Sequence, residues 1–457
     1  MNRYLSAIII LAALTNNTEL CAQSLMPAPR LVVNIIIDQL RTDYIEQFSP
    51  LYTPDGFKKL LQEGCVYEAA QYPFSPVDRA SAVASISTGT TPQYNNIVAG
   101  QWLDRATLRP VFCTDDEKYG ASPAKLATST ISDELKVATR GTSIIYSIAQ
   151  DKDAAILSGG HAADGAFWIN KKDGRWTTSS YYSETARNLV KAYNNATTYS
   201  DGNDAASALA ITCVDNTAMG RDETTDMLYI TLSGKSKNKE KTQSETNRQT
   251  DIELVYLKLD NILADIIKKL DEKIGNDKIL YILTGTGYTD NEPVDYSRYR
   301  IPTGTFYINR TANLLNMYLG AIYGQAQYVE TCFHNQIYID RKLLEQRHIS
   351  FNDVVLRSKE LLTQAAGVRD VTVSPYSTAV SGDLVIEVSP GWQLVNEDNQ
   401  EEYTSRTAFV PFPIIIYGVG TKPERVITPV TVDRIAPTIA KAIRIRAPNA
   451  CSSAPLQ

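Results

Sequence analysis

A nearly continuous β-branched run, LVVNIII at residues 31–37, ends directly in Asp38. A run without polar alternation is typical of a strand that is buried on both faces of a parallel sheet. Further strands are predicted at 154–158, 227–232 and 278–283, and helices at 43–61 and 251–274. Strands that alternate with helices predict an α/β fold with right-handed crossovers. Asp38 is then expected at the carboxyl edge of the sheet.

The pattern changes at about residues 295–411, where shorter amphipathic elements replace the buried runs. The predicted elements are a strand near 336–340, a helix near 351–366, and strands near 371–373 and 384–388. This order predicts a small α+β insertion, after which 412–417 returns to an apolar core strand. We therefore expect one core over residues 30–457 that carries an insertion at 295–411.

The first residues, MNRYLSAIIILAALTNNTELCAQ, combine one early basic residue, an apolar stretch and a small-residue exit at Cys21-Ala22. About 11 apolar residues cannot cross about 30 Å of hydrocarbon. We therefore predict a signal peptide over residues 1–22 that is cleaved near Ala22. A lipoprotein anchor on Cys21 is the competing interpretation, which the preceding Thr-Glu-Leu disfavours. No later segment is long and apolar enough to span a bilayer, so we expect an exported, periplasmic or outer-membrane-associated protein without a transmembrane segment.

Charge and side-chain inventory exclude some functions. The net charge of −6, with no basic run, disfavours a nucleic-acid partner. With only three His, at 161, 334 and 348, a multi-metal site would have to be built almost wholly from carboxylates.

Beyond the predicted signal peptide, five cysteines remain: Cys65, Cys113, Cys213, Cys332 and Cys451. An odd number leaves at least one unpaired, and their connectivity stays open. Between residues 233 and 251 no apolar residue occurs, which predicts a solvated loop.

Several long segments carry a resemblance to a known family. They are LVVNIIIDQLRTDY at 31–44, SISTGTTPQYNNIVAGQW at 85–102, AAILSGGHAADGAFWINKKDGRWTTSSYY at 154–182, IPTGTFYINRTANLLNMYLGAIYG at 301–324 and NQIYIDRKLL at 335–344. Together they resemble the alkaline phosphatase superfamily, in the branch of single-chain bacterial periplasmic alkaline phosphatases and type I phosphodiesterases or nucleotide pyrophosphatases. The resemblance implies an αβα sandwich with a mostly parallel central sheet and a small α+β insertion.

The resemblance also implies a chemistry in which two zinc ions activate a Thr or Ser hydroxyl and hold the phosphoryl oxygens. It implies an Asp at the end of the first strand, a nucleophilic Thr, an Asn before a Trp, and a Lys-x-Arg pair that contacts phosphate. The other metal ligands would come from an Asp-x-x-x-His loop, an Asp-His pair after a core strand, and a final His near the last strand.

Of these groups, only Asp38 is in place. The nucleophile position falls on Arg79, and a guanidinium cannot act as an alkoxide. Ser75 and Ser81 are nearby hydroxyls, but either would need a shift of register to replace the nucleophile. The expected Asn is Gly100, which has no side-chain donor.

The phosphate and metal positions differ as well. The Lys-x-Arg pair becomes Asp151-x-Asp153, so two cations that would attract phosphate are replaced by two anions that repel it. A polar stretch that begins at Ser233 replaces the Asp-x-x-x-His segment, and Thr286-Gly287 replaces the Asp-His pair. Residues 402–411 contain no His. His161 is interpreted as a structural residue, and the two other His as surface or packing residues.

These changes predict a catalytically inactive alkaline phosphatase-like protein without a cofactor, retained as a binding or scaffold protein with a protein partner in the cell envelope. A buried Asp38 needs a counter-ion, so we hypothesise that Arg79 pairs with Asp38, Asp151 or Asp153 in place of the metals. The alternative places Arg79 on an exposed loop. The alternative function is an exported, zinc-dependent phosphomonoesterase or phosphodiesterase with a rebuilt site, and an enzyme of unrelated chemistry also stays open.

Overall fold

The computed structural model describes residues 27–197, 202–235, 245–290, 299–399, 401–403, 406–408 and 410–457. The predicted signal peptide at 1–22 lies outside the described residues. Within them, no helix is long and apolar enough to cross a membrane. The five cysteines beyond the predicted signal peptide are all free in the described structure, with no disulfide among them.

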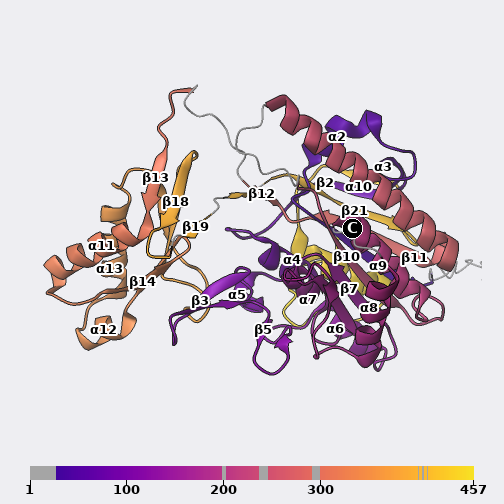
Figure 1. Cartoon of the computed structure of the whole chain (residues 1–457), viewed down its shortest axis with the longest axis horizontal. Coiled ribbons are helices and arrows are strands. Elements are labelled where there is room, and N and C mark those ends of the chain that lie inside the picture. The colour runs from indigo at the N-terminus through magenta and orange to yellow at the C-terminus, as the bar shows by residue number, and fades with distance from the viewer. Residues whose placement is uncertain are drawn as a thin grey trace, which may run out of the picture.

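A ten-stranded mixed sheet forms the centre of the core, in the order β22-β2-β21-β11-β1-β10-β7-β8-β9, with β23 beside β2 (Figure 1). Its strands are β1 (Leu31–Asp38), β2 (Cys65–Gln71), β7 (Ile145–Ala149), β8 (Gly165–Ile169), β9 (Trp176–Thr177), β10 (Asp226–Ser233), β11 (Ile279–Gly285), β21 (Phe412–Gly418), β22 (Glu424–Val426) and β23 (Val430–Thr431). The neighbours β11, β1, β10, β7 and β8 run parallel, whereas β21 is antiparallel to β11 and β2. The predicted α/β fold with a mostly parallel sheet is confirmed.

Two helical layers cover this sheet. One layer contains α2 (Thr42–Phe48), α3 (Phe57–Glu63), α8 (Glu184–Ala196), α9 (Asn203–Asp215) and α10 (Glu245–Ile274). The other contains α4 (Arg79–Thr88), α6 (Ile131–Ala138), α7 (Lys152–Gly159) and α14 (Ile435–Ile443). All eight residues of β1 are buried between them, which explains the continuous apolar run. Both α4 and α7 begin near the end of β1, because Arg79 in the first turn of α4 lies beside Asp38 and pairs with Asp151 and Asp153 at the start of α7.

One predicted strand is wrong. Residues 154–158 lie in α7, whose residues from Ala154 to Gly159 are all buried. A short apolar run that is buried on every side has no period, so it does not distinguish a strand from a buried helix. The sequence signal that distinguishes a helix from a strand here is the polar residue Asp151, which is the N-cap of α7.

Two further predicted boundaries differ. The helix predicted at 43–61 is divided into α2 and α3, separated by a short 3₁₀ turn (Ser49–Leu51) that contains Pro50; a proline removes a helix donor and ends the regular pattern. The polar stretch at 233–251 is not wholly a loop, because α10 already begins at Glu245; residues 236–244 lie outside the described residues.

A second hydrophobic core, separate from the main one, forms between residues 306 and 394. Its elements are β13 (Gly304–Tyr307), α11 (Ile308–Tyr323), β14 (Val329–Phe333), β15 (Gln336–Ile339), α12 (Arg341–Gln346), α13 (Phe351–Leu362), β16 (Val368–Val373), β17 (Leu384–Val388), β18 (Trp392–Asn396) and β19 (Glu401–Tyr403). Figure 1 shows these elements, in orange, to one side of the core. The boundaries 295 and 411 stay predictions.

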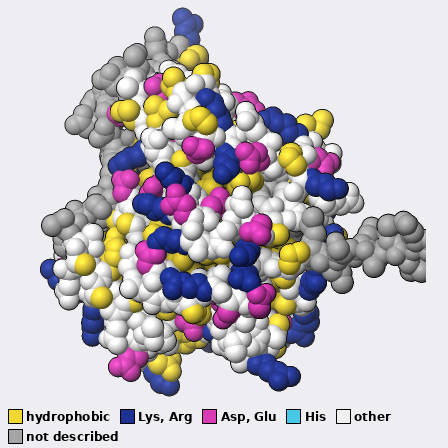
Figure 2. Space-filling view, turned by 90° about the vertical axis from the view of Figure 1, so that its right-hand side faces the viewer, with side chains coloured by type: hydrophobic (Ala, Val, Ile, Leu, Met, Phe, Trp, Pro, Cys, Tyr) yellow, Lys and Arg dark blue, Asp and Glu magenta, His cyan; other side chains and the backbone are white. Residues whose placement is uncertain are grey.

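A hairpin of the core links to this second unit. Arg105 lies in the turn between β3 (Gln101–Asp104) and β4 (Arg109–Phe112), and its Nη2 donates to Asp383 Oδ2 at 2.8 Å. Asp383 is fully buried and also accepts from Arg341 Nε at 2.7 Å. This ion-pair network fixes the second unit against the core. On the opposite side of the core, Lys, Arg, Asp and Glu are intermixed over the surface (Figure 2).

Candidate functional site

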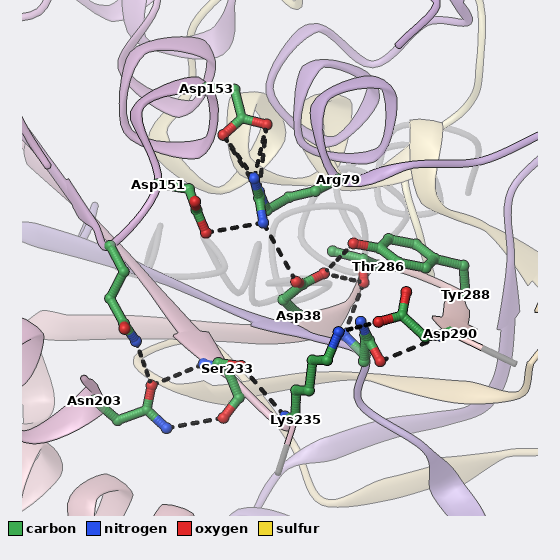
Figure 3. A network of polar contacts seen from close by, with 12 residues as sticks. Asp38, Arg79, Asp151, Asp153, Asn203, Ser233, Lys235, Thr286, Tyr288 and Asp290 are labelled. Atoms are coloured by element: carbon green, nitrogen blue, oxygen red, sulfur yellow. Dashed lines mark hydrogen bonds and ion pairs between the residues drawn. The ribbon is translucent and has the colours of Figure 1, made fainter. Parts of the chain in front are cut away.

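The candidate site lies where β1, β10 and β11 end. Asp38 closes β1 and is in register with Ser233 at the end of β10, while Thr286 follows β11 directly. The Asp38 side chain accepts at Oδ1 from the Thr286 hydroxyl at 2.9 Å and from the Tyr288 hydroxyl at 2.8 Å (Figure 3). Two hydroxyl donors therefore occupy one oxygen of the carboxylate that the resemblance assigns to a metal.

The other Asp38 oxygen faces Arg79, the first residue of α4. Arg79 Nη1 lies 3.8 Å from Asp38 Oδ2 and 2.8 Å from Asp151 Oδ2. Its Nε and Nη2 contact both oxygens of Asp153, at 3.1 to 3.3 Å. The structure thus brings Arg79 together with all three carboxylates of our hypothesis, and excludes the alternative of an exposed, unpaired Arg79.

Burial and charge set the protonation of this cluster. Burial raises the pKa of Asp38, although Arg79 and the two hydroxyl donors lower it. Burial alone would lower the pKa of Arg79, but the carboxylates of Asp153, Asp151 and Asp38 raise it further above its already high value. Arg79 is therefore a permanent cation and cannot supply an alkoxide-like nucleophile. One cation faces three carboxylates, so the cluster itself disfavours a further anion.

The start of α4 explains why Arg79 points into the site. Asp78 caps this helix: its Oδ1 accepts from Ser81 N at 2.9 Å, and its Oδ2 accepts from Gly100 N at 2.7 Å. The Ser81 side chain completes the capping box and is fully buried. Ser81 therefore serves as a structural hydroxyl. Ser75 is exposed and lines the neighbouring cavity.

The two glycines of the predicted site differ in how much room they leave. A Cβ added at Gly100 would have only the carboxylate oxygens of Asp78 and Asp153 within 4 Å, at 3.6 and 3.7 Å. A Cβ at Gly287 would lie 2.6 Å from the Tyr72 ring and 2.7 Å from the Phe412 ring, and Gly287 has a φ of +68°. A side chain, and therefore a histidine, does not fit at Gly287.

The segment after β10 is built from hydrogen bonds rather than metal ligands. Asn203, at the start of α9, donates to Ser233 O and accepts from Ser233 N, both at 2.8 Å. Lys235 pairs with Asp290 (Figure 3). The position of the expected Asp-x-x-x-His segment is thus occupied by the hydrogen bonds of Asn203 with Ser233 and by the ion pair of Lys235 with Asp290.

The residues present do not fit two zinc ions. Asp38 already accepts two hydroxyl hydrogen bonds and faces a guanidinium, and Gly287 leaves no space for an imidazole. In the described part of the chain, no three His, Cys, Asp or Glu side chains are arranged to hold a metal ion. Zinc prefers His and thiolate or carboxylate ligands in an open tetrahedral set, which this arrangement does not provide.

The three histidines lie elsewhere. His161 Nδ1 contacts Asp133 Oδ2 at 2.9 Å and its Nε2 contacts Leu126 O at 3.0 Å, as expected of a structural residue. His334 stacks on Phe333 with 3.9 Å between ring centroids. His348 is exposed in the turn after α12.

A large cavity lies between the core and the second unit, with a volume of about 960 Å³. Arg79, Asp151 and Asp153 line it on the core side, and residues of β14, β16 and β17 line it on the other side. The cluster therefore stands at the base of a space large enough for a small organic ligand.

Sequence reasoning missed several partners. Asp78, Tyr288, Asn203 and the pair of Lys235 with Asp290 were not predicted. The pattern Asp78-Arg79-Ala80-Ser81 before an apolar run is a helix-start signal that could have identified the cap of α4. The other contacts join residues up to about 250 positions apart, and local patterns do not reveal such pairs.

Comparison with known proteins identifies the class of protein that has this fold and site. The sequence matches the type I phosphodiesterase / nucleotide pyrophosphatase family over residues 32–408, so the chain belongs to this family. More particularly, its relatives place it in the bacterial branch of the alkaline phosphatase superfamily. Alkaline phosphatase PafA of Elizabethkingia meningoseptica is 23% identical and aligns over 94% of each chain. A Myroides odoratus protein named calcium-transporting ATPase is 25% identical over 95% of each chain.

Solved structures share this fold. Wild-type PafA matches with a TM-score of 0.79 at 23% identity, covering 94% of this chain and 98% of that one. Murine ectonucleotide pyrophosphatase / phosphodiesterase 5 matches with a TM-score of 0.56 at 12% identity, over 92% and 96% of the two chains. The predicted alkaline-phosphatase-like fold is confirmed by these likenesses.

Proposed function

We propose that this chain is a catalytically inactive member of its family that acts by binding. The observation that carries the proposal is the Arg79 guanidinium, which stands at the nucleophile position and is held by Asp38, Asp151 and Asp153. A guanidinium has no lone pair to offer as a nucleophile. It also supplies part of the positive charge that the three carboxylates require.

The same contacts weigh against phosphate as a ligand. Asp151 and Asp153 stand at the start of α7, where an anion would otherwise be stabilised by the helix terminus. Arg79, the buried cation of the cluster, already pairs with both carboxylates, and the exposed Lys171 lies 4.0 Å from Asp151. A phosphate entering here would meet carboxylates at the positions that the family resemblance assigns to Lys and Arg.

We propose a binding or scaffold role in the cell envelope, with a signal peptide at residues 1–22 and a protein partner. The support for export is the basic, apolar and small-residue order of the first residues. The partner remains a prediction from the loss of the catalytic groups.

Zinc content and phosphate release test the proposal. The purified mature chain is equilibrated with zinc, desalted and measured by mass spectrometry for bound metal, and then assayed with an aryl phosphate and a bis-aryl phosphate at alkaline pH. We expect no stoichiometric zinc, and release no faster than from the Arg79→Ala variant. PafA of Elizabethkingia meningoseptica serves as the assay control. Two zinc ions per chain, with turnover that a chelator abolishes, would instead establish the alternative zinc-dependent esterase.

A further inference from the structure

The cavity above Arg79 has features that point to the chemistry of its ligand. Its volume of about 960 Å³ falls within the range of about 300–1,000 Å³ typical of small-molecule sites. Its walls come from two separate hydrophobic units, the core and the insertion. Such interfaces between units are preferred places for ligands.

The charges that line the cavity are balanced. The lining includes four acidic residues, Asp78, Asp151, Asp153 and Glu387, and four basic residues, Arg79, Lys152, Lys171 and Arg369. Most of them are engaged within the protein: Arg79 with Asp151 and Asp153, Arg369 with Glu387, and Lys152 with Asp115 at 3.2 Å. A balanced and internally paired lining attracts neither phosphate nor a polycation. It favours an uncharged ligand.

Two buried hydroxyls of residues that line the cavity have no hydrogen-bond partner among the residues that the structure describes. They are Thr114 Oγ1, from the core, and Tyr376 OH, from the loop before β17. Burial, aided by the charge of Asp78, raises the pKa of Tyr376 to about 12, so its hydroxyl remains a donor at neutral pH. A buried polar group without a partner destabilises the protein. Each hydroxyl oxygen has less than 1 Å² of accessible surface, so a ligand oxygen offsets this destabilisation when the side chain turns toward the cavity that its residue lines.

Acceptors lie on the core side of the same cavity. Because Gly100 has no side chain, the space at its Cβ position is bordered by Asp78 Oδ2 and Asp153 Oδ2, at 3.6 and 3.7 Å. A hydroxyl of a ligand placed there can donate to either carboxylate. The cavity therefore presents donors and acceptors at separate points, which suits a ligand with several hydroxyls.

Aromatic rings and amides complete the lining. His334 stacks on Phe333 and lies 5.4 Å from the Tyr403 ring, while Trp168 faces the cavity from the core. Asn170 Oδ1 accepts from Lys172 N at 3.0 Å and Asn335 Nδ2 donates to Ile386 O at 3.1 Å. Within the described residues, the other end of each amide has no such bond and can pair with a ligand. Rings pack against apolar C–H faces, and amides pair with hydroxyls.

We propose that this cavity binds a neutral saccharide of a few sugar rings. Its hydroxyls would donate to Asp78 and Asp153 and accept from Tyr376 and Thr114, and its ring faces would pack on the aromatic side chains. This inference rests on the proposed function, because a site that does not hold zinc and phosphate is free to take an uncharged ligand.

An oligosaccharide array tests the inference. The mature chain is applied to neutral, phosphorylated and amino-sugar oligosaccharides, and the neutral oligosaccharide that binds best is then titrated calorimetrically. Tyr376→Phe removes only the hydroxyl, and we expect about tenfold weaker binding. Tyr182→Phe is the matched control, because Tyr182 OH is also buried without a partner but does not line the cavity. It should bind like the wild type. Thermal unfolding should show that both variants fold.

The outcomes separate this inference from the proposed function. An array that retains only phosphorylated or cationic oligosaccharides, or none, overturns the saccharide inference, as does a folded Tyr376→Phe variant of unchanged affinity. Neither result changes the expected absence of zinc and of phosphate release. Conversely, a zinc-dependent esterase would overturn the proposed function even if the chain also bound a saccharide.

Discussion

Arg79 forms a bidentate ion pair with Asp153. Its Nη2 lies 3.1 and 3.2 Å from the two carboxylate oxygens, and its Nε lies 3.3 Å from each. The pair joins the first turn of α4 to the first turn of α7. A helix start favours an anion and disfavours a cation, so Asp153 is well placed on α7 and Arg79 is poorly placed on α4. The pair resolves this conflict, because the carboxylates of α7 stabilise the cation on α4.

Replacing Arg79 by the uncharged Met should destabilise the fold. Arg79→Met leaves Asp38, Asp151 and Asp153 without their common counter-ion, and removing one partner of a largely buried pair typically costs about 3–5 kcal/mol. Because the Arg79 side chain is 26% exposed, we expect a lower value of about 1–3 kcal/mol. Urea unfolding at neutral pH measures the change in the free energy of unfolding.

The control for this experiment is Arg310→Met, which breaks the exposed pair of Arg310 with Glu397. Its effect should be clearly smaller, because water replaces the lost partner at the surface. If Arg79→Met were no more destabilising than this control, the cluster would not depend on its internal cation.

Neutralising the carboxylates beside Arg79 should create an anion site. In the double variant Asp151→Asn and Asp153→Asn, Arg79 is released from the carboxylates of α7, so its charge is available to an anion. We expect the wild type to show no saturable binding of inorganic phosphate, and the double variant to bind it saturably, at least about tenfold more tightly than the weakest affinity that the titration detects. Isothermal titration calorimetry with inorganic phosphate measures the affinity.

A second double variant, far from the cluster, tests whether phosphate binding depends on the charge beside Arg79 or on the net charge of the protein. Asp215→Asn with Asp265→Asn makes the same change in net charge at the exposed pairs with Lys273 and Lys269. It should leave phosphate binding as in the wild type. Equal gains in both double variants would show that net charge, rather than release of Arg79, controls phosphate affinity.

Asp38 should make stability depend on pH in a defined direction. Burial raises the pKa of Asp38 in the folded state, and a group with a raised pKa stabilises the fold at low pH and loses that contribution as the pH rises through the folded value. Asp38→Asn keeps Oδ1 as acceptor for Thr286 and Tyr288 but removes the charge. Relative to the wild type, the variant should gain stability as the pH rises above about 4.

Unfolding in urea at several pH values between about 4 and 8 measures the difference in the free energy of unfolding between Asp38→Asn and the wild type. Asp43→Asn is the contrasting control: burial would raise the pKa of Asp43, but its hydrogen bonds and charge pairing with Arg41 lower it overall. The advantage of the wild type over Asp43→Asn should therefore stay nearly constant between about pH 4 and 8 and fall only as the pH drops below about 4. A gap for Asp38→Asn that is flat, or that follows the Asp43 trend, would contradict the raised pKa.

The fold was largely predictable from the sequence, because buried parallel strands leave a continuous apolar run such as that of β1. The cluster of Arg79 with Asp38, Asp151 and Asp153 was also predictable, since the family resemblance assigns these positions to one site. The strand predicted at 154–158 failed because the fully buried α7 has no amphipathic period. Contacts such as Tyr288 with Asp38 could not be predicted, because they depend on tertiary packing and leave no local signal.

Gly287 should tolerate no side chain, and this would prevent a simple restoration of the metal site. An added Cβ would lie 2.6 Å from the Tyr72 ring at a φ of +68°, so Gly287→Ala combines overpacking of about 1–3 kcal/mol with a left-handed backbone cost of about 1–2 kcal/mol. Gly120→Ala is the matched control, because Gly120 has a φ of +74° and nothing within 4 Å of an added Cβ, so only the backbone cost applies. Urea unfolding should show the larger loss for Gly287→Ala. Equal losses would mean that the two rings can yield, and a histidine at this position would then be compatible with the fold.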